Sequence, residues 1–258
     1  MLRCADAALA ASVSNAGALG TISPYAGMKE GQDPLDNLRF QIRKTRQLTA
    51  RPFAVNVPLD LRASGLMLDL VVEENLGIVV TAAGSPELFT ELLHSSGIRV
   101  LHVVSSVSQA QFAESCGVDA VIAEGVEAGG RVGRDELALF SLIPQVADAV
   151  AIPVIAAGGI SDGRGMAAAL ALGAEGVQLG TRFIATVECP AHPEHKKAII
   201  EAGDTDTIVT GRGVAPVRRL KADLKEGEAY AGSSAGLIKN VIPAAEVIAE
   251  LVHYKPRI

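Results

Sequence analysis

The sequence predicts a (β/α) barrel of the TIM type, and three observations lead to this prediction. Short apolar runs alternate with stretches of helical pattern along most of the chain. The apolar runs are uninterrupted and rich in β-branched residues, as in parallel strands that are buried on both faces. The length of 258 residues suits a barrel formed as one domain. A doubly wound open sheet is the alternative that these patterns leave open.

Seven apolar runs are interpreted as strands because each is followed by glycine, serine or asparagine and then, in most cases, by a helical pattern. They span residues 18–23, 52–58, 77–83, 99–105, 118–124, 152–158 and 175–181. Helices are expected between them at residues 36–48, 85–96, 108–116, 136–150 and 163–173. Seven strands are one short of the eight that close a TIM barrel.

Composition bounds the class of protein. With 49% apolar and 20% charged residues, the chain can bury one sizeable core, so residues 1–258 are expected to form a single domain. A net charge of −6 provides no basic surface, and 3% aromatic residues with no tryptophan provide no base-stacking platform. Nucleic acid is therefore not an expected partner. No apolar run approaches the roughly 18 residues of a membrane span, so no membrane partner is expected either.

The three cysteines, Cys4, Cys116 and Cys189, are scattered and form no CxxC spacing. Neither a zinc site nor a disulfide framework is expected from this pattern, and no metal is assigned. Free thiols suit a reducing compartment, so the predicted location is cytoplasmic.

Functional residues of such barrels lie at the carboxyl ends of the strands. Gly158–Gly159 and Gly180–Thr181 follow the last two predicted strands. Glycines at these positions let backbone N–H groups approach an anion, and Thr181 adds a hydroxyl. Glycines after strands also serve as plain turns, but two such pairs on consecutive late strands favour a phosphate site.

Four stretches of sequence carry a resemblance to a known family. They are PVIAAGGISDGRGMAAALALGAEGVQLGTRFIATVECPAH, AEGVEAGG, SNAGALGTI and PFAVNVP. Together they resemble the nitronate monooxygenase family, once called 2-nitropropane dioxygenases, which is related to an FMN-dependent enoyl-acyl-carrier-protein reductase. The resemblance runs from about residue 5 to residue 252. It implies a TIM barrel that holds FMN non-covalently, carries a small lid-like helical segment and acts on a small-molecule substrate with O2.

The resemblance also implies roles for individual residues. Gly158, Gly159, Gly180 and Thr181 would hold the FMN phosphate. Asn56 would lie beside the isoalloxazine ring, Glu124 near the ribityl chain or ring edge, and Ser234 would reach back to the flavin from the closing segment. For Gln178, on the last strand, inward packing and cofactor contact both remain open.

The loop EGVEAGGRVG departs from the family, which has histidine as the catalytic residue where this chain has Arg131. A guanidinium group has a pKa above ~12 and no acceptor lone pair, so it cannot take a proton from carbon, but it can bind an anion. Arg131 is therefore expected to bind a pre-formed anionic nitronate and not to act on neutral nitroalkanes. The alternative is that Arg131 pairs with Glu127 or Asp135 and contacts no substrate. His102 either faces the pocket or is buried by the alternation along its strand.

Two further departures concern the ends of the chain. Family members begin with a strand resembling PIIQGGM, and this sequence opens about where that strand finishes, so the first strand is expected to be missing or truncated. A misplaced start would explain the gap; otherwise the amino terminus, a tail segment or a neighbouring subunit in a homo-oligomer could fill it. The lid, at about residues 190–240, is expected to be helical and reduced, and a closing helix is expected at 235–252.

Three functions follow from these observations. The first is FMN-dependent oxidation of anionic nitronates with O2. The second is an FMN- and NAD(P)H-dependent enoyl-acyl-carrier-protein reductase. The third is a catalytically impaired barrel that binds FMN without turnover, suggested by the missing strand and the absent histidine.

Overall fold

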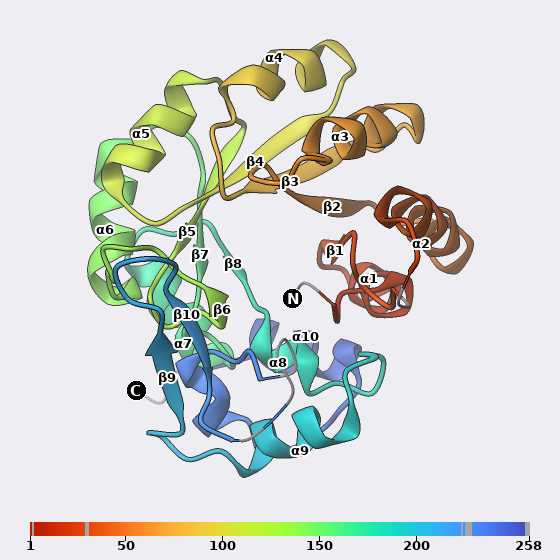
Figure 1. Ribbon diagram of the computed structural model, residues 1–258. Coiled ribbons are helices and arrows are strands. Elements are labelled where there is room, and N and C mark those ends of the chain that lie inside the picture. The colour runs from red at the N-terminus through yellow and green to blue at the C-terminus, as the bar shows by residue number, and fades with distance from the viewer. Residues whose placement is uncertain (2, 29–30, 223, 225–228, 256–258) are drawn as a thin grey trace.

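A computed structural model describes residues 1, 3–28, 31–222, 224 and 229–255. Its main feature is a curled sheet of seven parallel strands in the order β1-β2-β3-β4-β5-β7-β8, with helices along its outer side (Figure 1). The strands are β1 Gly20–Ile22, β2 Phe53–Pro58, β3 Ile78–Ala82, β4 Arg99–Val104, β5 Ala120–Glu124, β7 Val154–Ala157 and β8 Gly176–Gln178. All seven lie within the runs expected from the sequence, and the described residues have a TIM-type barrel fold with seven strands in the curled sheet.

The helices alternate with the strands as a barrel requires. They are α1 Ala7–Asn15, α2 Pro34–Leu48, α3 Ser64–Glu73, α4 Glu87–Ser95, α5 Val107–Ser115, α6 Leu139–Ala149, α7 Gly163–Ala171, α8 Thr181–Ile184, α9 Pro193–Glu201 and α10 Ala244–Val252. Among the described residues, no helix is both long and apolar enough to cross a membrane.

Aspartate caps fix where several helices begin. Asp33 accepts hydrogen bonds from the backbone N–H groups of Leu35 and Asp36 and precedes Pro34, a residue suited to the first helical turn. Asp6 caps α1 and Asp162 caps α7 in the same way. These local signals place α2 two residues earlier than the sequence pattern alone indicates.

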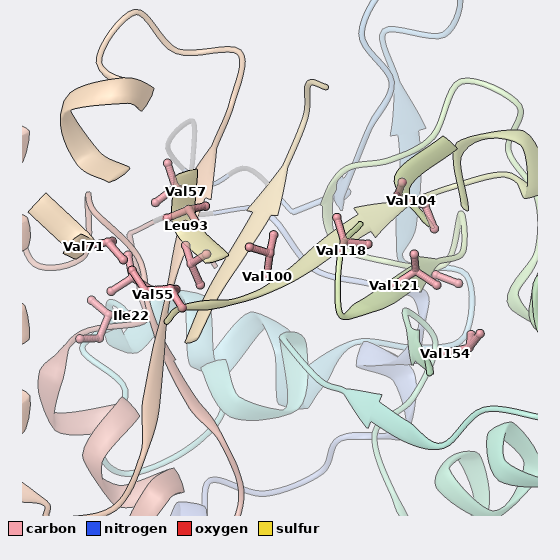
Figure 2. Close-up of a cluster of buried hydrophobic side chains, with 14 of the residues drawn as sticks. Ile22, Val55, Val57, Val71, Leu93, Val100, Val104, Val118, Val121 and Val154 are labelled. Atoms are coloured by element: carbon pink, nitrogen blue, oxygen red, sulfur yellow. The ribbon is translucent and has the colours of Figure 1, made fainter. Parts of the chain in front are cut away.

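Side chains alternate between the two faces of the curled sheet. The outer face packs against the helices through a large cluster of valine, leucine and isoleucine side chains, part of which is drawn in Figure 2. The inner face carries a separate, smaller cluster that includes Ala54, Val80, Ile122 and Ala157. Burial of the outer cluster is the main hydrophobic contribution to stability, at about 25 cal/mol per Å² of apolar surface. The inner face is left for shorter side chains and for polar groups near the strand ends.

The two terminal strands of the sheet, β1 and β8, do not pair with each other, and no other strand of the described residues joins them. Figure 1 shows the amino terminus between these strands. A Cβ atom placed on Gly180 would lie 3.5 Å from the Cγ atom of Met1, so the terminal residue reaches the end of β8. α1 packs on both α2 and α10 and covers this side of the molecule.

A small antiparallel sheet has no counterpart among the elements expected from the sequence, and neither does α3. It has the order β6-β10-β9, formed by Gly130–Arg131, Val217–Leu220 and Thr207–Thr210. Two of its strands come from the segment at 190–240, which therefore contains strands as well as the helix α9. These strands are only two to four residues long, too short to give a clear sequence signal, and each is stabilised by its neighbours in space.

The expected closing helix at 235–252 is two shorter elements. A 3-10 helix, Ser233–Leu237 (η1), is followed by α10, which begins at Ala244 directly after Pro243. A proline disfavours helical backbone in the residue before it, and this separates the two elements.

Candidate functional site

The ends of β7 and β8 form one edge of the candidate site. Ala157 pairs with Gln178, so the glycines that follow each strand lie side by side. Gly158 and Gly159 have φ angles of +95° and +72°, in the left-handed region that favours glycine. A Cβ atom on Gly158 would lie 2.9 Å from the backbone nitrogen of Ala128. This turn therefore requires glycine for both its conformation and its space.

The backbone N–H groups at this edge are available to a ligand. Within the described part of the chain, no protein group accepts a hydrogen bond from the amides of Gly158, Gly159, Gly180 or Thr181. The hydroxyl oxygen of Thr181 already accepts a hydrogen bond from the amide of Gly232, at 2.9 Å. Its own hydrogen remains free to be donated. The edge thus presents donors to an anion, as a phosphate site requires.

The closing segment is held against this edge. The amide of Ser233 donates to the carbonyl oxygen of Glu127 at 2.9 Å, and a Cβ atom on Gly232 would lie 2.6 Å from the same oxygen. These contacts bring the buried Ser234 close to Gly159, and both residues line one cavity of about 290 Å³. The role of Ser234 beside the cofactor stays a prediction.

Ser161 was not identified from the sequence. Its hydroxyl is buried and has no hydrogen-bond partner among the described residues, and it lies two residues after Gly159. A buried polar atom without a partner is costly unless a ligand or water satisfies it. The sequence signal was present, since Ser161 directly follows the glycine turn, but serine is also common in ordinary turns.

Asn56 and Glu124 occupy the inner face of the sheet at the carboxyl ends of β2 and β5. Asn56 is in register with Val80 and Glu124 with Ala157, both members of the inner cluster. Gln178 shares the inner face because it is also in register with Ala157. Burial raises the pKa of Glu124 to about 7, while the charge of the amino terminus acts to lower it. Glu124 therefore exchanges a proton near neutral pH.

His102 lies on the opposite face of the sheet. Its Nδ1 atom is 2.7 Å from the hydroxyl of Thr81, and its neighbours along the strand, Val100 and Val104, belong to the outer core. Burial lowers the pKa of His102 to about 4, so its imidazole is neutral at physiological pH. The alternation along β4 buries His102, and it is not a group of the site.

Arg131 lies on β6 at the mouth of the barrel, with about 60% of its side chain exposed. Its Nη1 atom donates to the Oδ2 atom of Asp60 at 2.5 Å. The partners suggested by the sequence, Glu127 and Asp135, are therefore not the ones found. Glu127 instead accepts from the amide of Leu139 at 2.9 Å. A partner 71 residues away could not be identified from local sequence.

Tyr25 completes this group of residues at the mouth. It follows β1, and its pKa is raised by burial and by the negative charge of nearby Asp60. This group combines residues from three parts of the chain: Tyr25 follows β1, Asp60 follows β2, and Arg131 lies on β6, after β5. Their shared position after a strand end was the only sequence signal for Tyr25 and Asp60.

This geometry defines a class of protein: a parallel barrel with glycines directly after its last strands and polar groups on its inner face. A sequence profile of the nitronate monooxygenase family matches residues 1–65 and 64–225. The chain belongs to this family, as the sequence resemblance indicated.

Curated relatives and solved structures agree with this assignment. The chain is 37% identical over 247 residues to a "Probable nitronate monooxygenase" of Staphylococcus saprophyticus, covering 78% of this chain and 68% of the relative. It is 36% identical over 232 residues to a Rhodococcus jostii protein, (3aS,4S,5R,7aS)-5-hydroxy-7a-methyl-1-oxo-octahydro-1H-indene-4-carboxyl-CoA dehydrogenase. That match covers 89% of this chain but only 63% of the relative, so the chain spans less than two thirds of the length of this protein.

The structural matches are more complete. FabK from Thermotoga maritima superimposes with a TM-score of 0.91 at 40% identity, covering 98% of this chain and 89% of that chain. A nitroalkane oxidase from Streptomyces ansochromogenes superimposes with a TM-score of 0.85 at 28% identity, covering 96% and 91% respectively. The match to FabK accords with the relation of the family to a reductase that the sequence resemblance implied.

Proposed function

We propose that this protein is an FMN-dependent oxidoreductase that oxidises anionic nitronates with O2. Membership of the nitronate monooxygenase family supports the class of reaction. The single observation that favours an anionic substrate is Arg131, a permanent cation at the mouth of the barrel where the family has histidine.

The residues at the β7–β8 edge fit the phosphate of FMN. The amides of Gly158, Gly159, Gly180 and Thr181 have no protein acceptor in the described residues, and a side chain on Gly158 would fill the turn. Asn56 and Glu124 face the inner side of the sheet, where the isoalloxazine ring would lie. When bound, FMN would supply the redox chemistry.

Arg131 would orient the substrate. One N–H of its guanidinium group binds Asp60, and the other four N–H donors have no acceptor among the described residues. A nitronate carries its charge on two oxygens, and a guanidinium group can bind such an anion with two parallel hydrogen bonds. Asp60 would then compete with the substrate for the same cation. Because Arg131 cannot remove a proton from carbon, a neutral nitroalkane would need another base.

Glu124 is the titratable group on the inner face with a pKa near neutrality. Glu124, which exchanges a proton, is on β5, and Arg131, which would bind the anion, is on β6. Glu124 would hold or release a proton beside the cofactor, and the open mouth would admit O2. The segment at 190–240, which contributes β9 and β10 to the sheet beside Arg131, would act as a small lid over this mouth.

The deciding experiment is anaerobic reduction of the FMN-loaded protein by nitroethane and by ethyl nitronate, followed by the flavin absorbance. We expect reduction by the nitronate and little or none by nitroethane over the same time. Equal rates with the two compounds would contradict the role of Arg131. Arg131→Ala should slow the reaction with the nitronate and leave the amount of bound FMN unchanged.

A second function is favoured by the match to FabK, which is the structure with the higher identity of the two compared above. As an enoyl-acyl-carrier-protein reductase, the protein would use NAD(P)H. Anaerobic NADH or NADPH should then bleach the flavin within seconds, whereas the nitronate reaction predicts little bleaching. A yellow protein that shows no measurable reaction with nitronates, NADH or NADPH would instead support a catalytically impaired barrel that binds FMN without turnover.

A further inference from the structure

Two of the three cysteines meet across a large distance in sequence. Cys4 precedes α1 and Cys189 follows α8, yet the Sγ atom of Cys189 lies 3.5 Å from the carbonyl oxygen of Cys4. Each of the two thiols also shifts the pKa of the other, as neighbouring side chains do. Cys189 is 3% exposed and belongs to the apolar core between α1, α9 and α10, and Cys4 packs against that core. The third cysteine, Cys116, lies at the end of α5 with no cysteine partner.

The surroundings of the pair favour a thiolate on Cys4. The neighbouring Cys189, the buried His195 and the charge of the amino terminus lower the pKa of Cys4 to about 5 against the opposing effect of burial. His195 is fixed in place because its Nε2 atom lies 3.2 Å from the carbonyl oxygen of Tyr230. The hydrogen bond to Cys4 and burial raise the pKa of Cys189, although nearby Lys196 opposes this.

The arrangement is that of an attacking thiolate beside a resolving thiol. Reactive cysteines are thiolates near cationic or hydrogen-bonding groups, whereas an isolated thiol such as Cys116 keeps its proton. Burial raises the pKa of Cys116. Among the described residues, no group of three or more His, Cys, Asp or Glu side chains is arranged to hold a metal ion. Thiol oxidation is therefore the chemistry that this cluster supports.

We propose that Cys4 and Cys189 form a peroxide-sensitive thiol pair that closes reversibly to a disulfide. The Cys4 thiolate attacks hydrogen peroxide, the O–O bond breaks, and a sulfenic acid and hydroxide form. The Cys189 thiol then attacks the sulfenic sulfur; an S–S bond forms, and the sulfenic oxygen leaves as water with the thiol proton. Two electrons pass from the two sulfurs to the peroxide. A dithiol such as dithiothreitol returns both cysteines to the reduced state.

The Cys4–Cys189 disulfide would link the two segments on either side of the gap between β1 and β8. Cys4 lies on the segment before α1 and β1, and Cys189 lies on the segment after β8 and α8, so the two cysteines flank the unpaired strands β1 and β8. Cys189 is also on the segment that begins with Gly180 and Thr181. A disulfide closing a loop of 185 residues would restrict the unfolded chain strongly. We expect the apparent Tm to rise by roughly 5–10 °C on oxidation.

The test uses the full chain, reduced and then treated with one to a few equivalents of hydrogen peroxide. Non-reducing peptide mapping should give one cross-linked product joining the peptides that contain Cys4 and Cys189, with a mass lower by two hydrogen atoms. Cys116→Ser is the matched control and should form the same product at the same rate. Oxidation of Cys116 before Cys4, a disulfide between two chains, or a Cys4 sulfinic acid without a cross-link would each overturn the proposal.

A second measurement separates a reactive pair from two cysteines that are merely close. The rate at which iodoacetamide alkylates Cys4 in the reduced protein is followed from pH 4 to 9 by mass spectrometry. Cys4 should reach half of its maximal rate near pH 5, and His195→Gln, which retains a donor to Tyr230, should move this midpoint to higher pH. A midpoint in the ordinary range for a thiol in both proteins would contradict the assignment. Neither measurement requires FMN or activity, so the result stands apart from the proposed function.

Discussion

The β7–β8 edge and the loop that carries Arg131 are two halves of one candidate site, and they differ in how they are built. The edge uses backbone: glycines with left-handed φ angles and amides without protein acceptors. The Arg131 loop uses a side chain, exposed and held by a carboxylate from another loop. The edge lies in the stretch that carries the resemblance to the family, whereas the loop has arginine where that resemblance implies histidine. A backbone site is constrained by conformation, and a side-chain site can change its chemistry by one substitution.

The largest expected effect is at the backbone half. Gly158→Ala should weaken FMN binding by about 100-fold or more, because alanine is strained at a φ of +95° and its Cβ would contact the nitrogen of Ala128. Titration of the apoprotein with FMN, followed by flavin fluorescence, measures this. Gly77→Ala is the matched control, since no atom lies within 4 Å of its added Cβ. Unchanged affinity in Gly158→Ala would remove the edge from the cofactor site.

At the side-chain half, Arg131→Ala should lower kcat/KM for ethyl nitronate by roughly 10- to 100-fold, the effect of losing a charge-assisted hydrogen bond of about 1.5–3 kcal/mol. Arg131→His restores the residue of the family and should add a reaction with neutral nitroethane. Steady-state oxygen consumption with both compounds checks these outcomes. If Arg131→His does not react with nitroethane, a histidine at this position is not sufficient to remove a proton from the neutral substrate.

Glu124 joins the two halves, and its pKa gives a prediction for stability. Its pKa is about 7 in the folded protein and about 4.5 as an ordinary carboxyl group, so the folded state holds the proton more tightly. Stability from this group is therefore fullest below pH 4.5 and is lost as the pH rises through 7. We expect a loss of about 1–3 kcal/mol over this interval, discounted because the side chain is partly exposed. Urea unfolding of the apoprotein should show this slope, and Glu124→Gln should reduce it.

The smallest effect is expected at Asp60. Asp60→Asn removes the charge that competes with the substrate for Arg131, so KM for ethyl nitronate should fall by at most about fivefold with little change in kcat, since a surface ion pair is worth about 0–1 kcal/mol. Steady-state kinetics at low ionic strength would detect it. A rise in KM would show that Asp60 positions the arginine and does not compete.

Local sequence was sufficient where the relevant interactions are local. The seven strands were predictable because uninterrupted runs of β-branched residues favour buried parallel strands. The glycine turns were predictable because their left-handed φ angles favour glycine. His102 illustrates the limit: alternation offered two faces, and only the pairing with Thr81 shows that it faces the helices. The small sheet around Arg131 was not predictable, because β6 has only two residues and lies 76 or more residues before the two strands that complete the sheet.

By itself, the sequence determined the alternation of strands and helices, the family, and the glycine-rich ends of β7 and β8, since each depends on residues close together in the chain. Only the tertiary structure decided which carboxylate pairs with Arg131, that Tyr25 and Ser161 belong near the site, and that Cys4 meets Cys189. Such contacts join loops that the closing of the sheet brings together. Which residues meet in these contacts depends on distances in the folded chain, and short-range sequence patterns carry no information about such distances.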